Sequence, residues 1–266
     1  MEKKGEHPYL GIIINYDRDK KLDKFSLDTL QDRYLWQNET SPQEAFARAS
    51  VFVSTFKEET DFDMAQRIYN YVSNLWFMFS TPILSNGGTT RGLPISCFLN
   101  YVPDNREGLS SHYDENIWLA SSGGGIGGYW GDVRSDGIPT SNGSKSTGSI
   151  PFMKVVDSQM LAFNQGVTRL CIYAAYMDIS HPDIEEFLTV RLPTGDIGRK
   201  CLNLHNAVNV TDEFMKAVKN NEKWHLRDPN DGTIRTTMSA RKLWEKVLEV
   251  RFRTCLLYTS PSPRDR

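Results

Sequence analysis

The sequence changes character near Thr81, and this change limits the possible folds more than any other feature. Before it, apolar residues recur at the spacing of amphipathic helices. After it, short β-prone runs alternate with helical segments. The strand candidates are residues 172–177 and 202–210, and the helix candidates are residues 151–163, 182–190, 212–219 and 240–251. Such alternation favours a parallel sheet or barrel, so the sequence predicts a helical N-terminal region followed by an α/β fold.

Two helices are predicted within residues 39–80. The first begins at Ser41, which forms a capping box with Glu44 and is followed by a proline at the first helical position. The second begins near Asp61, and the two are expected to form an antiparallel hairpin. Their predicted apolar faces are Ala45, Phe46, Ala49, Phe52, Val53 and Phe56 in the first helix, and Met64, Ile68, Val72, Leu75 and Phe79 in the second. Residues 1–38 are charged and only weakly periodic.

The composition is that of an ordinary globular protein, with 39% apolar and 24% charged residues among 266. A formal net charge of -2 argues against partners such as nucleic acid or an anionic membrane. No apolar run approaches the roughly 18 residues that a membrane span needs. The N-terminus also lacks the apolar core of a signal sequence, so a cytoplasmic location is expected.

The four cysteines, Cys97, Cys171, Cys201 and Cys255, lie far apart and form no C-x-x-C pair. This spacing disfavours a disulfide framework and a zinc site. Cys171 and Cys201 adjoin strand candidates and are expected to be packing residues. The five histidines lack metal-ligand spacing, and no metal is expected in this chain.

A glycine cluster occupies residues 121–131, with the sequence SSGGGIGGYWG. It formally matches G-x-G-x-x-G, but no apolar strand precedes it, so a dinucleotide-binding turn is not expected. Residues 143–148 resemble a phosphate loop only superficially, because the Lys-Ser pair falls inside the glycines rather than after them. A flexible surface loop is one possible structure for this cluster, but Ile126, Tyr129 and Trp130 disfavour it. These residues predict a tightly packed turn where the backbone approaches another group closely.

Residues 255–266 abandon the helical pattern that runs through residues 240–251. Their sequence is similar to a translated sequencing adapter, and we expect this tail to be non-native. The native reading frame is then expected to stop near Thr254.

Several separated motifs resemble those of class I ribonucleotide reductase large subunits. The TPILS segment that starts at Thr81 leads to Ser96 and Cys97, and the glycine cluster, QGVTR, SHPDIEEF and NAVNVTDEF follow in the family's order. The resemblance covers roughly residues 25–254. It implies an N-terminal helical region and, over residues 81–254, the first part of a ten-stranded catalytic α/β barrel that is truncated in this chain.

The resemblance implies thiyl-radical reduction of ribonucleotides, with diphosphates as the expected substrates. Cys97 corresponds to one reducing cysteine, which protonates the leaving 2'-hydroxyl and then forms a disulfide with a partner cysteine. Thr81, Ser96 and Gly125 correspond to substrate-binding positions, where hydroxyl and backbone N–H groups hold phosphate or ribose oxygens. Taken alone, Cys97 would more commonly be a small buried hydrophobic residue.

The resemblance also implies a binding site for allosteric nucleotides. Asp104 matches the acid that binds the effector's deoxyribose, and Arg134 matches an arginine that binds its phosphates. The alternative is a solvated surface acid and an ordinary salt-bridging arginine.

A specificity loop is implied between the effector and substrate sites, and Gln165 and Arg169 match positions on it. The family usually has a glycine shortly after this arginine, whereas this chain has Leu170 and Cys171. Side chains at these positions restrict the backbone more than glycine does. We therefore expect the loop to pass on specificity differently from the family's loop.

The remaining implications concern partners and missing parts. A metal-containing small (beta) subunit would supply the radical, a thioredoxin- or glutaredoxin-type protein the reducing equivalents, and dNTPs or ATP would act as effectors. The full-length protein would be a homodimer. No N-L-C-x-E segment, which carries the radical cysteine and the catalytic glutamate, occurs among the 266 residues, so this chain alone is expected to be inactive.

Two other functions stay open at this point. A cobalamin-dependent class II reductase shares this half of the barrel and needs no radical-bearing small subunit. A noncatalytic module would use only the effector site to bind deoxynucleotides. The DNA that follows codon 254 would discriminate between these alternatives.

Overall fold

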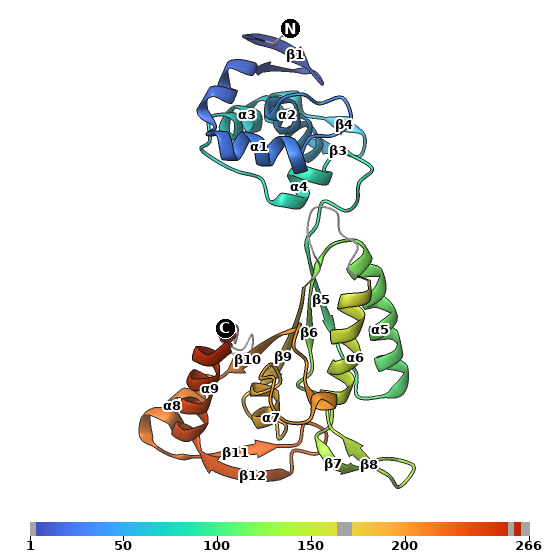
Figure 1. Ribbon diagram of the computed structural model, residues 1–266, viewed down its shortest axis with the longest axis vertical. Coiled ribbons are helices and arrows are strands. Elements are labelled where there is room, and N and C mark those ends of the chain that lie inside the picture. Colours follow the sequence, from blue (N-terminus) through green and yellow to red (C-terminus); the bar gives the residue numbers. More distant parts are fainter. Residues whose placement is uncertain (1–3, 164–171, 255–257, 262–266) are drawn as a thin grey trace. The chain divides into compact units, whose positions relative to one another are not determined.

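The computed structural model describes residues 4–163, 172–254 and 258–261. These residues form two compact units, Met1–Ser96 and Cys97–Arg266 (Figure 1). Each unit encloses a hydrophobic core of its own. The first is mainly helical and the second is α/β, which confirms the predicted fold class.

The first unit surrounds one central helix, α2, in which residues 42–50 are all buried. Two antiparallel hairpins, β1–β2 and β3–β4, flank the helices. The elements in chain order are β1 (Glu6–Tyr9), β2 (Ile12–Asn15), the 3-10 helix η1 (Tyr16–Lys21), α1 (Lys24–Arg33), α2 (Pro42–Val53), β3 (Thr55–Phe56), β4 (Glu59–Thr60), α3 (Phe62–Ser73) and α4 (Thr81–Asn86).

The start of α2 has the predicted capping box. The Ser41 N–H donates to Glu44 Oε2 at 3.2 Å, and the Gln43 N–H donates to Ser41 Oγ at 3.1 Å. The following proline suits the first helical position because the N–H that it lacks would have no partner within the helix. Tyr16 donates its hydroxyl to Glu44 Oε1 at 2.7 Å, so the cap is also tied to η1.

The apolar faces predicted for α2 and α3 extend too far. Phe56 lies in β3 with 76% of its surface exposed, not on the buried face of a helix. Lys57 and Glu58 have φ values of 46° and 70°, so the chain reverses between β3 and β4. Leu75, with φ of 62°, lies beyond the end of α3. Helical spacing does not reveal these turns, because none of the left-handed residues is the glycine that normally marks them.

The first unit extends to Ser96, beyond residue 81, the expected start of the α/β segment. The reason is the attachment of α4 to α2 through Arg48. Its guanidinium donates to the main-chain oxygens of Leu84 at 3.2 Å and Gly87 at 2.6 Å, and to Glu39 Oε1 at 2.6 Å. The Arg48 and Glu39 side chains are buried, and the hydrogen bonds from Arg48 to the two main-chain oxygens fasten the end of α4 to α2.

The second unit is built on a five-stranded sheet with the order β13-β10-β9-β6-β5, in which every pair is parallel. Two antiparallel hairpins, β7–β8 and β11–β12, project from it. The elements are β5 (Cys97–Tyr101), α5 (Arg106–Ser121), β6 (Gly125–Tyr129), β7 (Asp136–Pro139), β8 (Lys145–Thr147), α6 (Ile150–Ala162), β9 (Tyr173–Asp178), α7 (Ile184–Leu188), η2 (Ile197–Arg199), β10 (His205–Val210), α8 (Asp212–Asn220), β11 (Lys223–Arg227), β12 (Ile234–Ser239), α9 (Ala240–Thr254) and β13 (Tyr258–Pro261).

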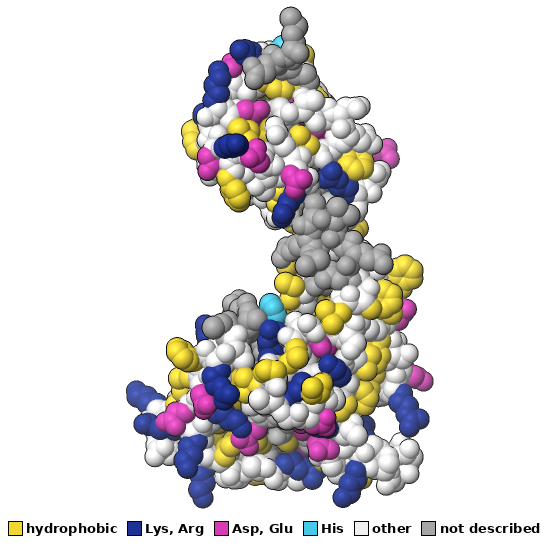
Figure 2. Space-filling model, viewed as in Figure 1, with side chains coloured by type: hydrophobic (Ala, Val, Ile, Leu, Met, Phe, Trp, Pro, Cys, Tyr) yellow, Lys and Arg dark blue, Asp and Glu magenta, His cyan; other side chains and the backbone are white. Residues whose placement is uncertain are grey.

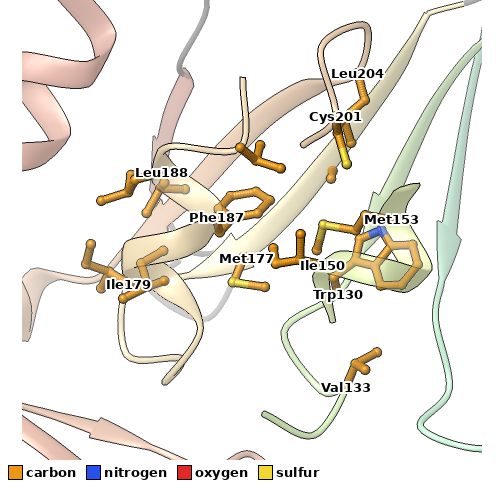
Figure 3. Packing of buried hydrophobic residues seen from close by; sticks show 14 of the residues in the cluster. Trp130, Val133, Ile150, Met153, Met177, Ile179, Phe187, Leu188, Cys201 and Leu204 are labelled. Atoms are coloured by element: carbon orange, nitrogen blue, oxygen red, sulfur yellow. The ribbon is translucent and has the colours of Figure 1, made fainter. Parts of the chain in front are cut away.

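Helices connect successive parallel strands, as parallel pairing requires. α5 joins β5 to β6, and α6 precedes β9 and packs beside α5 (Figure 1). Buried side chains from α6, α7, β9 and the segment after β6 fill the core, among them Trp130, Met153, Met177 and Phe187 (Figure 3). The strand and helix candidates after residue 150 are all found close to their predicted positions.

The prediction of a packed turn at the glycine cluster is wrong in its secondary structure, because residues 125–129 form the strand β6. The expected close approach is present. A Cβ on Gly128 would overlap the hydroxyl of Tyr173, and one on Gly124 would overlap the ring of Phe98. The absence of side chains therefore lets β6 pair on both sides while large neighbours cross it.

Candidate functional site

Cys97 and Gly125 lie side by side at the first residues of β5 and β6. They are paired in the parallel register, and the ends of both strands coincide there. Cys97 is exposed, whereas the cysteine Cys201 is fully buried, and burial raises the pKa of Cys201 to about 12. The structure therefore brings together the predicted reducing cysteine and one predicted substrate position. Its exposure does not match the alternative of a buried hydrophobic residue for Cys97.

The other two predicted substrate residues belong to the first unit. Thr81 begins α4, and its hydroxyl lies 3.3 Å from the hydroxyl of Tyr34. Ser96 is half-buried and is the last residue of that unit, directly before Cys97 in the chain. Tyr34 was not predicted to contact the site, since nothing in the local sequence links it to Thr81.

The predicted effector residues, Asp104 and Arg134, contact each other. Arg134 Nε donates to Asp104 Oδ2 at 2.7 Å, and its Nη2 donates to the Asp104 main-chain oxygen at 3.3 Å. Asp104 follows β5 and Arg134 follows β6, so adjacent parallel strands deliver the two residues to one end of the sheet. Their side chains are 20% and 26% exposed, which leaves the pair accessible to a ligand. Gln165 and Arg169, the predicted loop residues, lie outside the described residues.

A polar chain that the sequence did not predict runs along the same end of the sheet. Tyr101 shares a face of β5 with Cys97 by strand alternation. Its ring stacks on that of Tyr129, with 6.3 Å between the ring centroids. The Tyr129 hydroxyl donates to Asp178 Oδ2 at 2.7 Å, and Asn209 Nδ2 donates to Asp178 Oδ1 at 3.0 Å. Carboxyl ends of parallel strands are the usual place for ligand-binding groups. Strand alternation would have been the only sequence signal for this row of polar residues.

A second network supports the sheet from the helical side. His112 Nε2 lies 3.0 Å from the Tyr173 hydroxyl and 2.9 Å from Asn116 Nδ2, and Trp130 Nε1 donates to the same hydroxyl at 2.9 Å. Burial lowers the pKa of His112 to about 4 and raises the pKa of Tyr173. Both side chains are therefore neutral at pH 7, and they brace β6 and β9 by hydrogen bonds without charge.

Within residues 4–163, 172–254 and 258–261, no cluster of three or more His, Cys, Asp or Glu side chains is arranged to bind a metal ion. None of the helices in this described part has the length and apolarity needed to cross a membrane.

Comparisons with known proteins find two matches that follow the two units. The profile of the ribonucleotide reductase all-alpha domain matches residues 20–92, and that of the ribonucleotide reductase barrel domain matches residues 95–259. A protein of Frog virus 3 (isolate Goorha) is 52% identical over 192 residues, which is 72% of this chain and 33% of that protein. The ribonucleoside-diphosphate reductase large subunit of Invertebrate iridescent virus 6 is 41% identical over 250 residues, which is 91% of this chain and 25% of that protein.

A solved structure is also similar. The Actinobacillus ureae class Id ribonucleotide reductase alpha subunit matches with a TM-score of 0.70 and 28% identity, over 90% of this chain and 40% of that chain. The chain thus spans about a quarter to a third of the length of the two viral relatives.

Proposed function

The chain belongs to the ribonucleotide reductase large-subunit family, and we propose that it supplies an effector site and one wall of the substrate site to such a reductase. The complete protein would reduce ribonucleoside diphosphates to 2'-deoxyribonucleotides for DNA synthesis. The observation that carries the proposal is the contact between Asp104 and Arg134 at the end of the strand that Cys97 begins.

Cys97 is proposed to act as one thiol of the reducing pair. Its thiol would give a proton to the departing 2'-hydroxyl, and the two thiols would then supply two electrons as they join in a disulfide. Its exposed position at the start of β5 suits this role. The neighbouring Gly125 has no side chain, so a ribose or phosphate oxygen can approach the β6 backbone. Thr81 and Ser96 are proposed to hold substrate oxygens by their hydroxyls.

Asp104 and Arg134 are proposed to bind a deoxynucleoside triphosphate or ATP. A guanidinium offers several N–H donors in a planar fork that matches phosphate oxygens. A carboxylate accepts hydrogen bonds from a sugar hydroxyl. The two groups hydrogen-bond to each other, so neither is left uncompensated. Gln165 and Arg169 are proposed to connect this site with the substrate.

Partners are proposed by family membership. A metal-containing small subunit would supply the radical, and a thioredoxin- or glutaredoxin-type protein would re-reduce the disulfide, in the cytoplasm.

A homodimer is supported by the outer faces of α5 and α6, where Trp118, Val155 and Leu161 are 70%, 42% and 62% exposed. Figure 2 shows hydrophobic side chains gathered over these two helices. Exposed apolar patches of this kind commonly mark association surfaces.

The effector proposal is tested by calorimetric titration of the 266-residue chain with each of the four deoxynucleoside triphosphates and with ATP. We expect saturable binding of at least one of them, and a loss of about tenfold or more in affinity for Arg134→Ala, because one charge-assisted contact to phosphate is removed. Arg33→Ala is the matched control, since Arg33 is an exposed arginine of the other unit. Absence of binding by the unaltered chain would refute the proposal.

The catalytic part is tested in the complete reductase of which this chain is a part, with Cys97→Ser. Serine keeps the size and hydrogen bonding of the side chain but cannot form the disulfide. We expect loss of deoxynucleotide formation with unchanged effector affinity. Multiple turnovers by the serine variant would exclude Cys97 from the reducing pair.

A further inference from the structure

The backbone on both sides of Arg134 is held by three buried side chains from distant parts of the second unit. His181 Nε2 donates to the main-chain oxygen of Val133 at 2.8 Å. Asp183 Oδ1 accepts from the N–H of Asp136 at 3.0 Å. The third is Asp228, which contacts Ser135. Every neighbour of Arg134 in residues 133–136 is therefore fixed, and the arginine side chain alone extends toward Asp104.

The imidazole of His181 is fixed in one tautomer. Its Nδ1 accepts the N–H of Asp183 at 3.0 Å, so the ring proton sits on Nε2 and is donated to Val133. The ring is 2% exposed. With both nitrogens engaged, it cannot rotate without losing a buried hydrogen bond.

Asp183 links this segment to the start of α6. Its Oδ2 accepts the N–H of Ser149 at 3.0 Å and the Ser149 hydroxyl at 3.2 Å, while Oδ1 holds Asp136. Because Ser149 precedes α6, the carboxylate also lies where the N–H groups of a helix start favour negative charge. The Asp183 carboxylate thus holds Asp136 and Ser149, which lie at the two ends of the β7–β8 hairpin.

Asp228 holds Ser135, the residue directly after Arg134. Its Oδ2 accepts the Ser135 hydroxyl at 2.7 Å and the Ser135 N–H at 3.3 Å, and its Oδ1 accepts the N–H of Asn230 at 3.0 Å. Asp228 and Ser135 are each 1% exposed. A buried carboxylate that accepts three hydrogen bonds is a rigid anchor, because moving it would leave a charge unsatisfied.

We propose that His181, Asp183 and Asp228 are positioning residues for Arg134, which they aim at the nucleotide phosphates by fixing residues 133, 135 and 136. The inference rests on the effector role proposed above for Arg134. Bidentate recognition of phosphate needs a guanidinium held in a defined plane and direction. The Arg134 side chain is 26% exposed and its guanidinium contacts Asp104, and the clamped backbone adds to this order by fixing where the side chain starts.

The test compares Asp228→Asn with Asp157→Asn in the 266-residue chain. Asp157 is also 1% exposed and also accepts backbone N–H groups, those of Asn203 at 2.9 Å and Leu204 at 2.8 Å, but it does not contact residues 133–136. In each variant the asparagine NH2 can replace a carboxylate oxygen that accepted a hydrogen bond, which leaves two donors facing each other. Both variants are therefore expected to lower the melting temperature. The affinity for each of the four deoxynucleoside triphosphates is then measured calorimetrically well below the melting transition.

We expect Asp228→Asn to weaken nucleotide binding about tenfold, the lower end of what loss of an outer hydrogen-bond partner costs at metal sites. Asp157→Asn is expected to leave the affinity unchanged. If Asp228→Asn fails to fold, Ser135→Ala removes only the 2.7 Å hydrogen bond and is expected to weaken binding in the same direction. Equal affinities in the two aspartate variants, or in Ser135→Ala and the unaltered chain, would overturn the positioning role. If the unaltered chain binds neither these four nucleotides nor ATP, the effector site itself is wrong.

Discussion

Acidification should destabilise the second unit through the protonation of His112. This side chain is 2% exposed, and burial lowers its pKa from 6.5 to about 4. The unfolded chain takes up a proton near pH 6.5, whereas the folded chain does so only near pH 4. The contribution of neutral His112 to stability is therefore complete above pH 6.5 and is lost as the pH falls toward 4.

The magnitude follows from the difference between the two pKa values. Each pKa unit corresponds to about 1.4 kcal/mol, so the free energy of unfolding should fall by about 3 kcal/mol between pH 6.5 and pH 4. His112→Gln removes this titration. It also costs stability at pH 7, because glutamine does not reproduce the ring's contacts with Tyr173 and Trp130, but that cost does not depend on pH.

The assay is urea unfolding followed by tryptophan fluorescence at several pH values from 7.5 to 4. The stability difference between the unaltered chain and His112→Gln should shrink by about 3 kcal/mol over this range, since only the unaltered chain pays for keeping a neutral histidine. Carboxylates titrate in both proteins and cancel. Parallel curves for His112→Gln and the unaltered chain would refute the reasoning.

Three further perturbations test the packing and the thiols. Gly128→Ala should cost about 2 kcal/mol or more, because the added methyl group overlaps a buried tyrosine hydroxyl, whereas Gly92→Ala meets only an ordinary contact; equal urea midpoints would contradict this. Arg48→Met should cost about 3–5 kcal/mol in urea unfolding, because it leaves a buried glutamate without its cation, and a loss below about 1 kcal/mol would show that α4 is held otherwise. With iodoacetamide at pH 8, Cys97 should be alkylated in the folded chain and Cys201 should not, as peptide mass spectrometry can determine; modification of both at equal rates would contradict the difference in burial.

The elements that could be predicted from the sequence are those whose signals are local. The capping box at Ser41 and the periodic apolar residues of α6, α8 and α9 each specify a helix within one segment of chain. The strand β6 could not be predicted, because five of the six residues 123–128 are glycines, with Ile126 between them, and they carry no alternating pattern. What makes this segment a strand is its parallel pairing with β5 and β9, where its glycines leave room for Phe98 and Tyr173, and this information lies elsewhere in the chain.

The residues proposed for the site could be predicted only where a short sequence motif contains them. Motif resemblance predicted site roles for Cys97, Asp104 and Arg134, which stay predictions, and the parallel register explains why the last two residues meet. The polar chain through Tyr129 and Asp178 was missed, because its members come from four strands and share no motif. Contacts of this kind depend on strand order, which the sequence did not specify.

The contact between Asp104 and Arg134 fits a binding site better than a purely structural ion pair. Water reaches this partly exposed ion pair and screens it, so its contribution to stability is smaller than that of a fully buried pair. The same weakness makes the pair easy to open, because a triphosphate offers Arg134 several anionic oxygens in exchange for one carboxylate. Once released, Asp104 can accept from the sugar of the same nucleotide. In the proposed effector site, a fixed backbone and a weak ion pair would be complementary: the first would set the direction of the guanidinium, and the second would hold it at little cost until a phosphate binds.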